Sequence, residues 1–296
     1  MNRLPDFIII GAMKCATSTL HDQLARQPGL FMSEPKEPCF FSDDEVYARG
    51  LDWYKSLFAH LPVDALCGES STHYTKLPTY SHTAERMRRH VPSARLVYVM
   101  RHPVARLASQ YIHEWSERTV PSSIDAAVAR CPRLIDYSRY RMQLQPFLET
   151  FGAENVLPVF FERLINEPQG ELDRICAFIR YPREARWHQD GDRRNISEQR
   201  LRNSALRDAI VWNPGVTWLR RRFIPQGWRD HVKRLWQMKR RPQLSAELLT
   251  RVEQRFDEDL AVLGEWLGVE LTCENFQDVV TAKPLEFAGC ASGSRV

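Results

Sequence analysis

The sequence predicts an α/β fold, a single domain in which helices flank a central, mostly parallel sheet and the C-terminal portion is helical. Short β-forming runs alternate with helix-like segments from residue 6 to residue 179, which is the order typical of parallel sheets. One run, Leu96–Met100, is apolar throughout, as expected for a central strand that is covered on both faces. The strand pattern stops after Arg180.

The first half of the chain is expected to open with the strand Asp6–Ala12, which is rich in isoleucine and contains a glycine near its end. The helix-like pattern Leu20–Gln27 follows it, and the proline-punctuated stretch Ser33–Phe41 is expected to be extended. The next elements are predicted, in chain order, as a helix over Tyr47–Phe58, a strand over Ala65–Ser71, a helix over Pro78–His90 and a strand over Ala94–Arg101.

In the second half, Pro103 can occupy the first turn of a helix. Helices are predicted over Ser123–Arg130, Asp136–Phe151 and Gln169–Ile179, and a strand is predicted over Asn155–Leu164. A long amphipathic helix is expected from about Ser245, an N-cap candidate, with one apolar face formed by Leu248, Val252, Phe256, Leu260, Leu263 and Leu267.

The 296 residues are expected to form one domain over residues 1–280, because no internal repeat or linker divides the chain. Its core is expected at residues 5–180 and its basic, helical C-terminal portion at residues 181–280, followed by a flexible tail at residues 281–296. Residues 180–241 carry 17 Lys or Arg against 6 Asp or Glu, within a formal net charge of +4 for the whole chain. This imbalance indicates an anionic ligand or surface partner.

Composition narrows the class of protein further. No apolar run approaches the roughly 20 residues of a membrane span, and no secretory signal is recognisable. The seven cysteines are scattered without a CxxC pair, so neither a zinc site nor a disulfide framework is indicated. We therefore expect thiols in a reducing environment and a cytoplasmic location.

The stretch IGAMKCATST, residues 10–19, lies between the first strand and its helix and resembles a P-loop-like phosphate-binding loop. Backbone N–H groups at the helix start, the Lys14 ammonium and the hydroxyls of Thr17, Ser18 and Thr19 can all face one oxyanion. The alternative is an ordinary turn whose hydroxyls cap the helix. An ATP-binding loop would read GxxxxGK[ST], and no GK[ST] occurs in the chain, so binding without a metal is expected.

A second anion site is predicted in MRHPVARLASQY, residues 100–111. Arg101 ends the central strand, where charged residues usually line the ligand crevice of a parallel sheet. Ser109 lies two turns into the following helix, and the two side chains can together bind a second phosphate.

These paired motifs resemble those of the sulfotransferases that use 3′-phosphoadenosine 5′-phosphosulfate (PAPS), and residues 5–180 are similar to the bacterial and heparan-sulfate branches. The resemblance implies that Lys14 contacts the 5′-phosphosulfate and stabilises charge on the leaving phosphate. It implies that Arg101 and Ser109 hold the 3′-phosphate, that PAP is the product and that no metal is required. The loop residues expected to bind the cofactor are Lys14, Cys15, Ala16, Thr17, Ser18 and Thr19.

The same resemblance implies that Glu37, in SEPKEPCFF, is the catalytic base, with aromatic and proline neighbours that could raise its pKa. The alternative is a surface glutamate paired with Lys36, and Glu34 is the second carboxylate candidate. Related glycan enzymes often carry a histidine at position 39 and a lysine at position 70, where this chain has Cys39 and Ser70. Histidine bases remain as alternatives at His73, His102 and His113.

The basic segment is expected to close over the nucleotide, with Arg194, Arg200 or Arg202 adding a phosphate contact. The expected function is sulfuryl transfer from PAPS to a hydroxyl of a small-molecule, glycan or lipid acceptor. The alternatives are an ATP-dependent P-loop kinase and a non-enzymatic nucleotide- or nucleic-acid-binding module, although no nucleic-acid motif is recognisable and nucleic acid is not the expected partner. The acceptor and the oligomeric state stay open.

Overall fold

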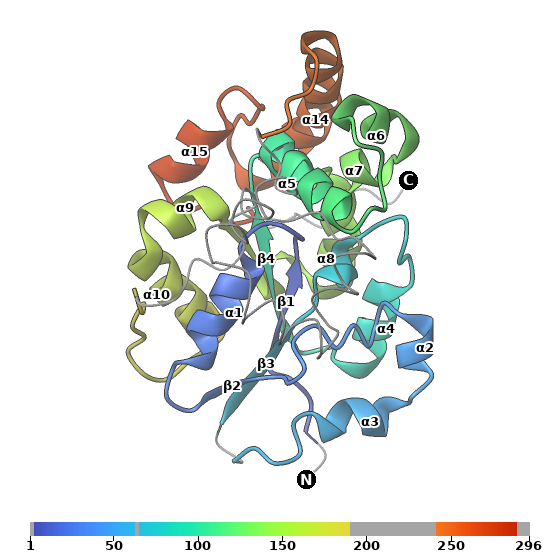
Figure 1. Cartoon of the computed structure of the whole chain (residues 1–296). Coiled ribbons are helices and arrows are strands. Elements are labelled where there is room, and N and C mark those ends of the chain that lie inside the picture. The colour runs from blue at the N-terminus through green and yellow to red at the C-terminus, as the bar shows by residue number, and fades with distance from the viewer. Residues whose placement is uncertain (1–2, 63–64, 190–240, 289–296) are drawn as a thin grey trace, which may run out of the picture.

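The computed structural model describes residues 3–62, 65–189 and 241–288. They contain a five-stranded sheet with the order β2-β3-β1-β4-β5, in which every neighbouring pair is parallel. The predicted α/β class with a central parallel sheet is confirmed. Helices α1 and α10 lie on one side of the sheet, and α4 and α8 lie on the other (Figure 1). The strands are β1 Phe7–Gly11, β2 Leu30–Met32, β3 Leu66–Ser70, β4 Arg95–Met100 and β5 Val156–Phe160.

Strands β1 and β4 form the centre of the core. Both lie side by side with registered pairs such as Ile9 with Val97, and every residue from Leu96 to Met100 is fully buried. The continuous apolar run therefore forms a strand that is covered on both faces, as predicted. The short edge strand β2 was not predicted, because three residues give no periodicity to detect.

Helices connect the strands in the described part of the chain. In chain order they are α1 Thr17–Ala25, α2 Asp44–Tyr47, α3 Leu51–Ser56, η1 Thr72–Thr75, α4 Thr83–His90, α5 Pro103–Ser116, α6 Ile124–Arg130, α7 Arg133–Asp136, α8 Tyr140–Phe151, η2 Ala153–Asn155, α9 Phe161–Asn166, α10 Pro168–Phe178, α14 Ala246–Leu267 and α15 Phe276–Ala282.

Several predicted bounds were wrong for local reasons. The helix expected over Tyr47–Phe58 is broken at Gly50, whose φ of 84° is incompatible with a continuous right-handed helix. The strand expected over Asn155–Leu164 ends at Phe160, where α9 begins. Apolar residues continue across that boundary, so burial alone does not mark the change from strand to helix.

Helix α14 was predicted well, and its apolar face packs on the core. Its contact with α8 includes Asp259, which accepts hydrogen bonds from the backbone N–H groups of Arg141 and Met142. Ser245 is the N-cap residue, but its side chain makes no capping hydrogen bond. None of the helices in the described ranges combines the length and apolar composition that would be needed to cross a bilayer.

The flexible tail predicted from residue 281 is wrong for its first part. Leu285 and Phe287 are buried, and the backbone N–H of Ala288 donates to the carbonyl of Trp266 at 2.8 Å. These contacts follow α15, which was not predicted because its apolar residues are few and its length is only seven residues. Residues 289–296, the remainder of the predicted tail, lie outside the described residues.

The order of the strands indicates where a ligand crevice is expected. The chain leaves β1 toward β2 and β3 on one side, and it leaves β4 toward β5 on the other. In parallel sheets a ligand crevice forms at such a switch point, outside the carboxyl ends of the strands. The segments after β1, β3, β4 and β5 therefore converge at one edge.

Candidate functional site

The loop after β1 is fixed to the sheet before it reaches α1. The Thr75 hydroxyl donates to the carbonyl of Ile10 at 2.8 Å, and the backbone N–H of Ala12 donates to Val99 of β4 at 2.8 Å. A Cβ atom on Gly11 would lie 2.0 Å from the Thr75 Oγ1 atom, so the close approach requires glycine. Lys14 and Ala16 then adopt left-handed backbone angles, which bring the chain to the start of α1.

The start of α1 presents the N–H groups that the anion-site prediction needs. Ala16 is the N-cap, and its side chain makes no capping hydrogen bond. The first hydrogen bond of the helix runs from the N–H of Leu20 to Ala16, so the N–H groups of residues 17–19 precede it. Ser18 and Thr19 are half-buried, and Thr17 is buried.

The predicted loop residue Cys15 does not present its side chain to this site. Its thiol is fully buried, and burial raises its pKa to about 12. Only the backbone of Cys15 is in a position to contribute to a ligand site in this loop.

Arg101 leaves the tip of β4 toward the phosphate loop. Its guanidinium donates to the carbonyl of Lys14 at 3.5 Å and lies over the Phe161 ring, with 4.4 Å to the ring centroid. The Tyr140 hydroxyl holds the Arg101 backbone from the other side. Ser109 is 2% exposed within α5. The structure thus brings Arg101 to the loop, as predicted, through a carbonyl contact that local sequence does not reveal.

Glu37 lies next to the phosphate loop although it follows the edge strand β2, which is not adjacent to β1 in the sheet. The Lys36 ammonium donates to the Ser18 hydroxyl at 2.7 Å and to Glu37 Oε1 at 3.2 Å. The Thr72 hydroxyl donates to Glu37 Oε2 at 3.0 Å. The pairing with Lys36 that the alternative interpretation proposed therefore exists, but the pair is half-buried at the site and not on an open surface.

The predicted rise in the pKa of Glu37 is wrong. Burial is the largest single influence and does raise the pKa of this carboxyl. The positive charge of Lys36, the hydrogen bonds from Thr72 and Lys36, and the charge of Lys76 together outweigh burial and hold the pKa below its usual value. Glu37 is thus ionised at neutral pH and able to accept a proton.

The next carboxyl group inward is Glu69 on β3, which is fully buried beside Tyr54 and Tyr74. Burial raises its pKa to about 8, against the lowering effect of the two tyrosine hydroxyls. The following residue, Ser70, places its hydroxyl 2.9 Å from His21 Nδ1. The position at which related glycan enzymes carry a lysine is therefore used in this chain for a buried contact with α1.

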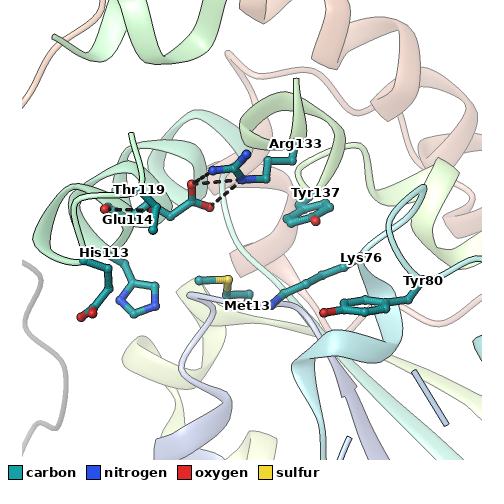
Figure 2. A pocket seen from close by; sticks show the side chains of 9 residues that line it. Met13, Lys76, Tyr80, His113, Glu114, Thr119, Arg133 and Tyr137 are labelled. Carbon is teal, nitrogen blue, oxygen red and sulfur yellow. Dashed lines mark hydrogen bonds and ion pairs between the residues drawn. The ribbon is translucent and has the colours of Figure 1, made fainter. Parts of the chain in front are cut away.

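A cavity of about 320 Å³ opens beside the phosphate loop. Figure 2 shows Met13 and Lys76 at its base and the ion pair of Glu114 with Arg133 along its wall. Burial lowers the pKa of Lys76 to about 8, although Glu37 and Cys39 oppose that change. The residues that line the cavity are Met13, Lys76, Tyr80, His113, Glu114, Glu117, Thr119, Arg133 and Tyr137.

The remaining predicted candidates are a second carboxylate, three histidines and three arginines. Glu34, the second carboxylate candidate, is exposed. His102 Nε2 lies 2.9 Å from the carbonyl of Cys273, so this histidine is tied to the C-terminal portion. His73 stacks on Tyr80 and lies near Cys39 and Glu37, whereas His113 lines the cavity. The predicted contacts Arg194, Arg200 and Arg202 lie outside the described residues.

Sequence reasoning missed three functional candidates, and each was missed because its contact is long-range. The sequence predicts Lys36 only as a partner of Glu37, yet its second contact is with Ser18. Thr72 and Lys76 belong to the segment after β3, which carries no phosphate or nucleotide motif. Only the polar composition of that segment, directly after a buried strand, could have indicated them.

Comparisons with known proteins find similarity to sulfotransferases. The model of the sulfotransferase family matches residues 55–185. Heparan sulfate glucosamine 3-O-sulfotransferase 3B1 of Mus musculus is 33% identical over 189 residues, which cover 60% of this chain and 46% of that protein. Heparan sulfate glucosamine 3-O-sulfotransferase 6 of Homo sapiens is 31% identical over 188 residues, which cover 60% of this chain and 52% of that protein. The chain thus spans about half the length of these curated relatives.

A solved structure extends the agreement over most of the fold. The sulfotransferase from Alicyclobacillus acidocaldarius superimposes with a TM-score of 0.63 at 22% identity, covering 91% of this chain and 98% of that one. At this identity the match shows a shared fold. Together with the family model over residues 55–185 and the curated relatives, it shows that this chain is similar to sulfotransferases in sequence and in fold.

Proposed function

We propose that this protein transfers a sulfuryl group from PAPS to an acceptor hydroxyl, with Glu37 as the general base. The observation that carries the proposal is the Lys36 bridge, which joins Ser18 of the phosphate loop to Glu37 with hydrogen bonds of 2.7 and 3.2 Å. It sets a carboxylate beside the start of a helix whose N–H groups suit an oxyanion. An alcohol bound between them would face the donor and the base together.

Each group has a distinct task in this mechanism. Bound PAPS supplies the sulfuryl group and a phosphate leaving group. The N–H groups of residues 17–19, the Ser18 hydroxyl and the Lys14 ammonium stabilise negative charge on that phosphate. Arg101 and Ser109 hold the second, 3′-phosphate end. Glu37, ionised and hydrogen-bonded by Thr72, takes the proton of the acceptor hydroxyl as the new S–O bond forms.

The donor set fits a nucleotide with two anionic ends. The start of α1 and the tip of β4 are separate groups of donors, and the Arg101 contact with Lys14 joins them. The acceptor is proposed to occupy the cavity beside Met13, which is large enough for a sugar-sized group. Tyrosine rings, a lysine and an ion pair line it, so a small-molecule, glycan or lipid acceptor with polar groups suits it. The names of the curated relatives, which act on heparan sulfate glucosamine, favour a glycan.

We further propose that residues 1–280 act as one sulfotransferase domain. The C-terminal helix α14 supports this, because it packs on α8 through Asp259 and so belongs to the same core. His102, at the start of α5, also contacts the C-terminal portion through Cys273.

Calorimetric titration with 3′,5′-adenosine bisphosphate (PAP) in the presence of EDTA tests the proposal. We expect binding without metal, and we expect Lys14→Ala and Arg101→Ala each to weaken it by roughly 10- to 100-fold, the equivalent of one charge-assisted hydrogen bond. Arg89→Ala, an exposed arginine on α4, is the matched control and should bind normally. Tighter binding of magnesium ATP than of PAP would instead support the kinase alternative.

A further inference from the structure

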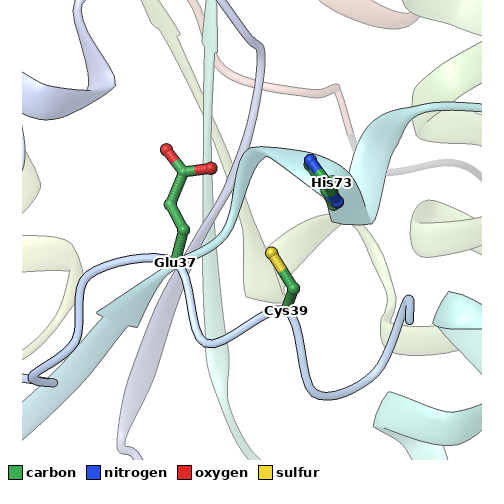
Figure 3. A group of neighbouring side chains, drawn as sticks. All are labelled: Glu37, Cys39 and His73. Atoms are coloured by element: carbon green, nitrogen blue, oxygen red, sulfur yellow. The ribbon is translucent and has the colours of Figure 1, made fainter. Parts of the chain in front are cut away.

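Three metal-binding types of side chain meet at the edge of the proposed active site. The Glu37 carboxylate, the Cys39 thiol and the His73 imidazole each offer one ligand atom, and these atoms all lie within 4.8 Å of one another. Figure 3 shows Glu37 and Cys39 on the same side of their loop, with His73 next to the thiol. Cys39 is the residue at which related glycan enzymes often carry a histidine, so this donor set is a property of the present chain.

The two segments that supply the donors are fastened together on both sides of the cluster. The backbone N–H of Cys39 donates to the Ser71 hydroxyl at 3.0 Å, and the Thr72 hydroxyl donates to Glu37 at 3.0 Å. These two hydrogen bonds hold the loop and η1 in their relative positions.

One ring nitrogen of His73 is unsatisfied among the described residues. Its Nδ1 atom is buried and makes no hydrogen bond within the part of the chain that the structure describes. Buried ring nitrogens normally have a partner, and the absence of one calls for an explanation. Burial, helped by the charge of Lys76, lowers the pKa of His73, so the imidazole is in the neutral form that binds metals.

The donor set selects the kind of metal. A thiolate, an imidazole and a carboxylate are typical ligands of Zn²⁺, which leaves a fourth position for water, whereas Mg²⁺ and Ca²⁺ prefer oxygen ligands alone. Tetrahedral zinc ligands lie about 3.5 Å apart, so the side chains must close by roughly 1 Å. The Cys39 proton leaves to solvent as the Zn–S bond forms, and the carboxylate and thiolate then balance the charge of the ion.

Two lysines oppose the ion and limit its affinity. Lys36 donates to Glu37, and the charge of Lys76 acts on Glu37, Cys39 and His73. Zinc must therefore compete with Lys36 for the carboxylate. This competition favours reversible binding over a permanent structural site.

We propose that Glu37, Cys39 and His73 bind Zn²⁺, and that the bound ion switches sulfuryl transfer off by occupying the carboxylate that accepts the acceptor proton. The binding claim is independent of the activity. The switch rests on the proposed function.

Competition with a chromophoric zinc chelator tests the binding claim on the full chain without donor or acceptor. We expect the wild-type protein to bind one Zn²⁺ more than Cys39→Ser and one more than His73→Asn, while Cys131→Ser, which changes a buried thiol at the end of α6, matches the wild type. Zinc should also protect Cys39 from iodoacetamide, read by mass spectrometry, and Mg²⁺ should not. Equal zinc binding by the wild type and Cys39→Ser would overturn the proposal.

The switch has its own readout. PAP should bind with and without zinc, since the phosphate donors are not ligands. With labelled PAPS and an acceptor from a screen, zinc should inhibit the wild type and leave Cys39→Ser active. Equal inhibition of both would refute the switch, whereas a chain that binds zinc but not PAP would refute the proposed function and leave the metal site standing.

Discussion

At Glu37, four interactions compete for one carboxyl group, and their balance fixes its protonation state. Burial favours the neutral acid, but Lys36, Thr72 and the charge of Lys76 favour the anion and prevail. The lowered pKa makes Glu37 a weaker base, but it also keeps the carboxylate ionised at neutral pH. The hydrogen bonds to its two oxygens fix its orientation. Thr72 on one oxygen and Lys36 on the other fix the plane of the carboxylate. In the proposed mechanism, position therefore matters more than basicity.

Replacing Glu37 with glutamine should lower kcat by roughly 10²- to 10⁴-fold, because an amide of the same shape cannot accept the proton. PAP affinity, measured by calorimetry, should change little, since in the proposed mechanism the carboxylate faces the acceptor and not the phosphates. Turnover is measured with labelled PAPS and an acceptor found by screening.

Glu34→Gln is the matched control, because Glu34 is an exposed glutamate of the same loop. It should keep wild-type turnover. The assignment of the base fails if Glu34→Gln loses activity while Glu37→Gln retains it.

At the scale of the elements, the β1–α1 junction depends on the absence of a side chain. The Thr75 hydroxyl lies against Gly11 and donates to the carbonyl of Ile10. The Tyr98 ring of β4 also contacts the position that a Cβ atom on Gly11 would occupy. The segment after β3 and the loop after β1 are thus packed against each other through one glycine. Any added atom there must move either the loop or η1.

Gly11→Ala should therefore destabilise the protein by about 1–3 kcal/mol, as overpacked sites do, and should also weaken PAP binding because the loop shifts. Urea unfolding and calorimetry measure the two effects. Gly268→Ala is the control: Gly268 also has a positive φ, at the end of α14, but a Cβ there would meet nothing within 4 Å. It should lose about 1 kcal/mol of stability and no PAP affinity. Equal PAP affinity in both variants would contradict the packing argument.

The contrast between Ser18 and Lys36 shows which features sequence could predict. The turn between β1 and α1 was predictable because a buried strand, a glycine and three hydroxyls are adjacent in the chain, and their geometry follows from local rules. The bridge from Lys36 to Ser18 joins residues from different loops, so only the folded sheet brings them together. The pKa of Glu37 was mispredicted partly for the same reason. Its neighbour Lys36 has the largest lowering effect, but Thr72 and Lys76, which also lower it, arrive from the segment after β3.

At the scale of the whole molecule, the core contains a fully buried carboxyl group. Glu69 is on β3 between β1 and the edge strand, and it is fully buried. Burial raises its pKa to about 8, so the folded protein keeps this carboxyl protonated at pH values where the unfolded chain has lost the proton. Such a group makes the stability of the entire fold depend on pH.

The sign follows from the two pKa values. Below about 4.5, the ordinary value for glutamate, both states hold the proton and Glu69 adds no pH dependence. Between about 4.5 and about 8, only the unfolded chain releases it, so the free energy of unfolding falls by about 1.4 kcal/mol for each pH unit of rise. Above about 8 the loss is complete.

Glu69→Gln removes this titration and keeps the shape of the side chain. Its stability relative to the wild type, measured by urea unfolding at several pH values, should rise steadily from pH 5 to pH 8. Glu45→Gln, an exposed residue of α2, should show a constant difference over the same range. A flat difference for Glu69→Gln would mean that Glu69 is ionised in the folded core, and its tyrosine neighbours Tyr54 and Tyr74 would then have to stabilise a buried negative charge.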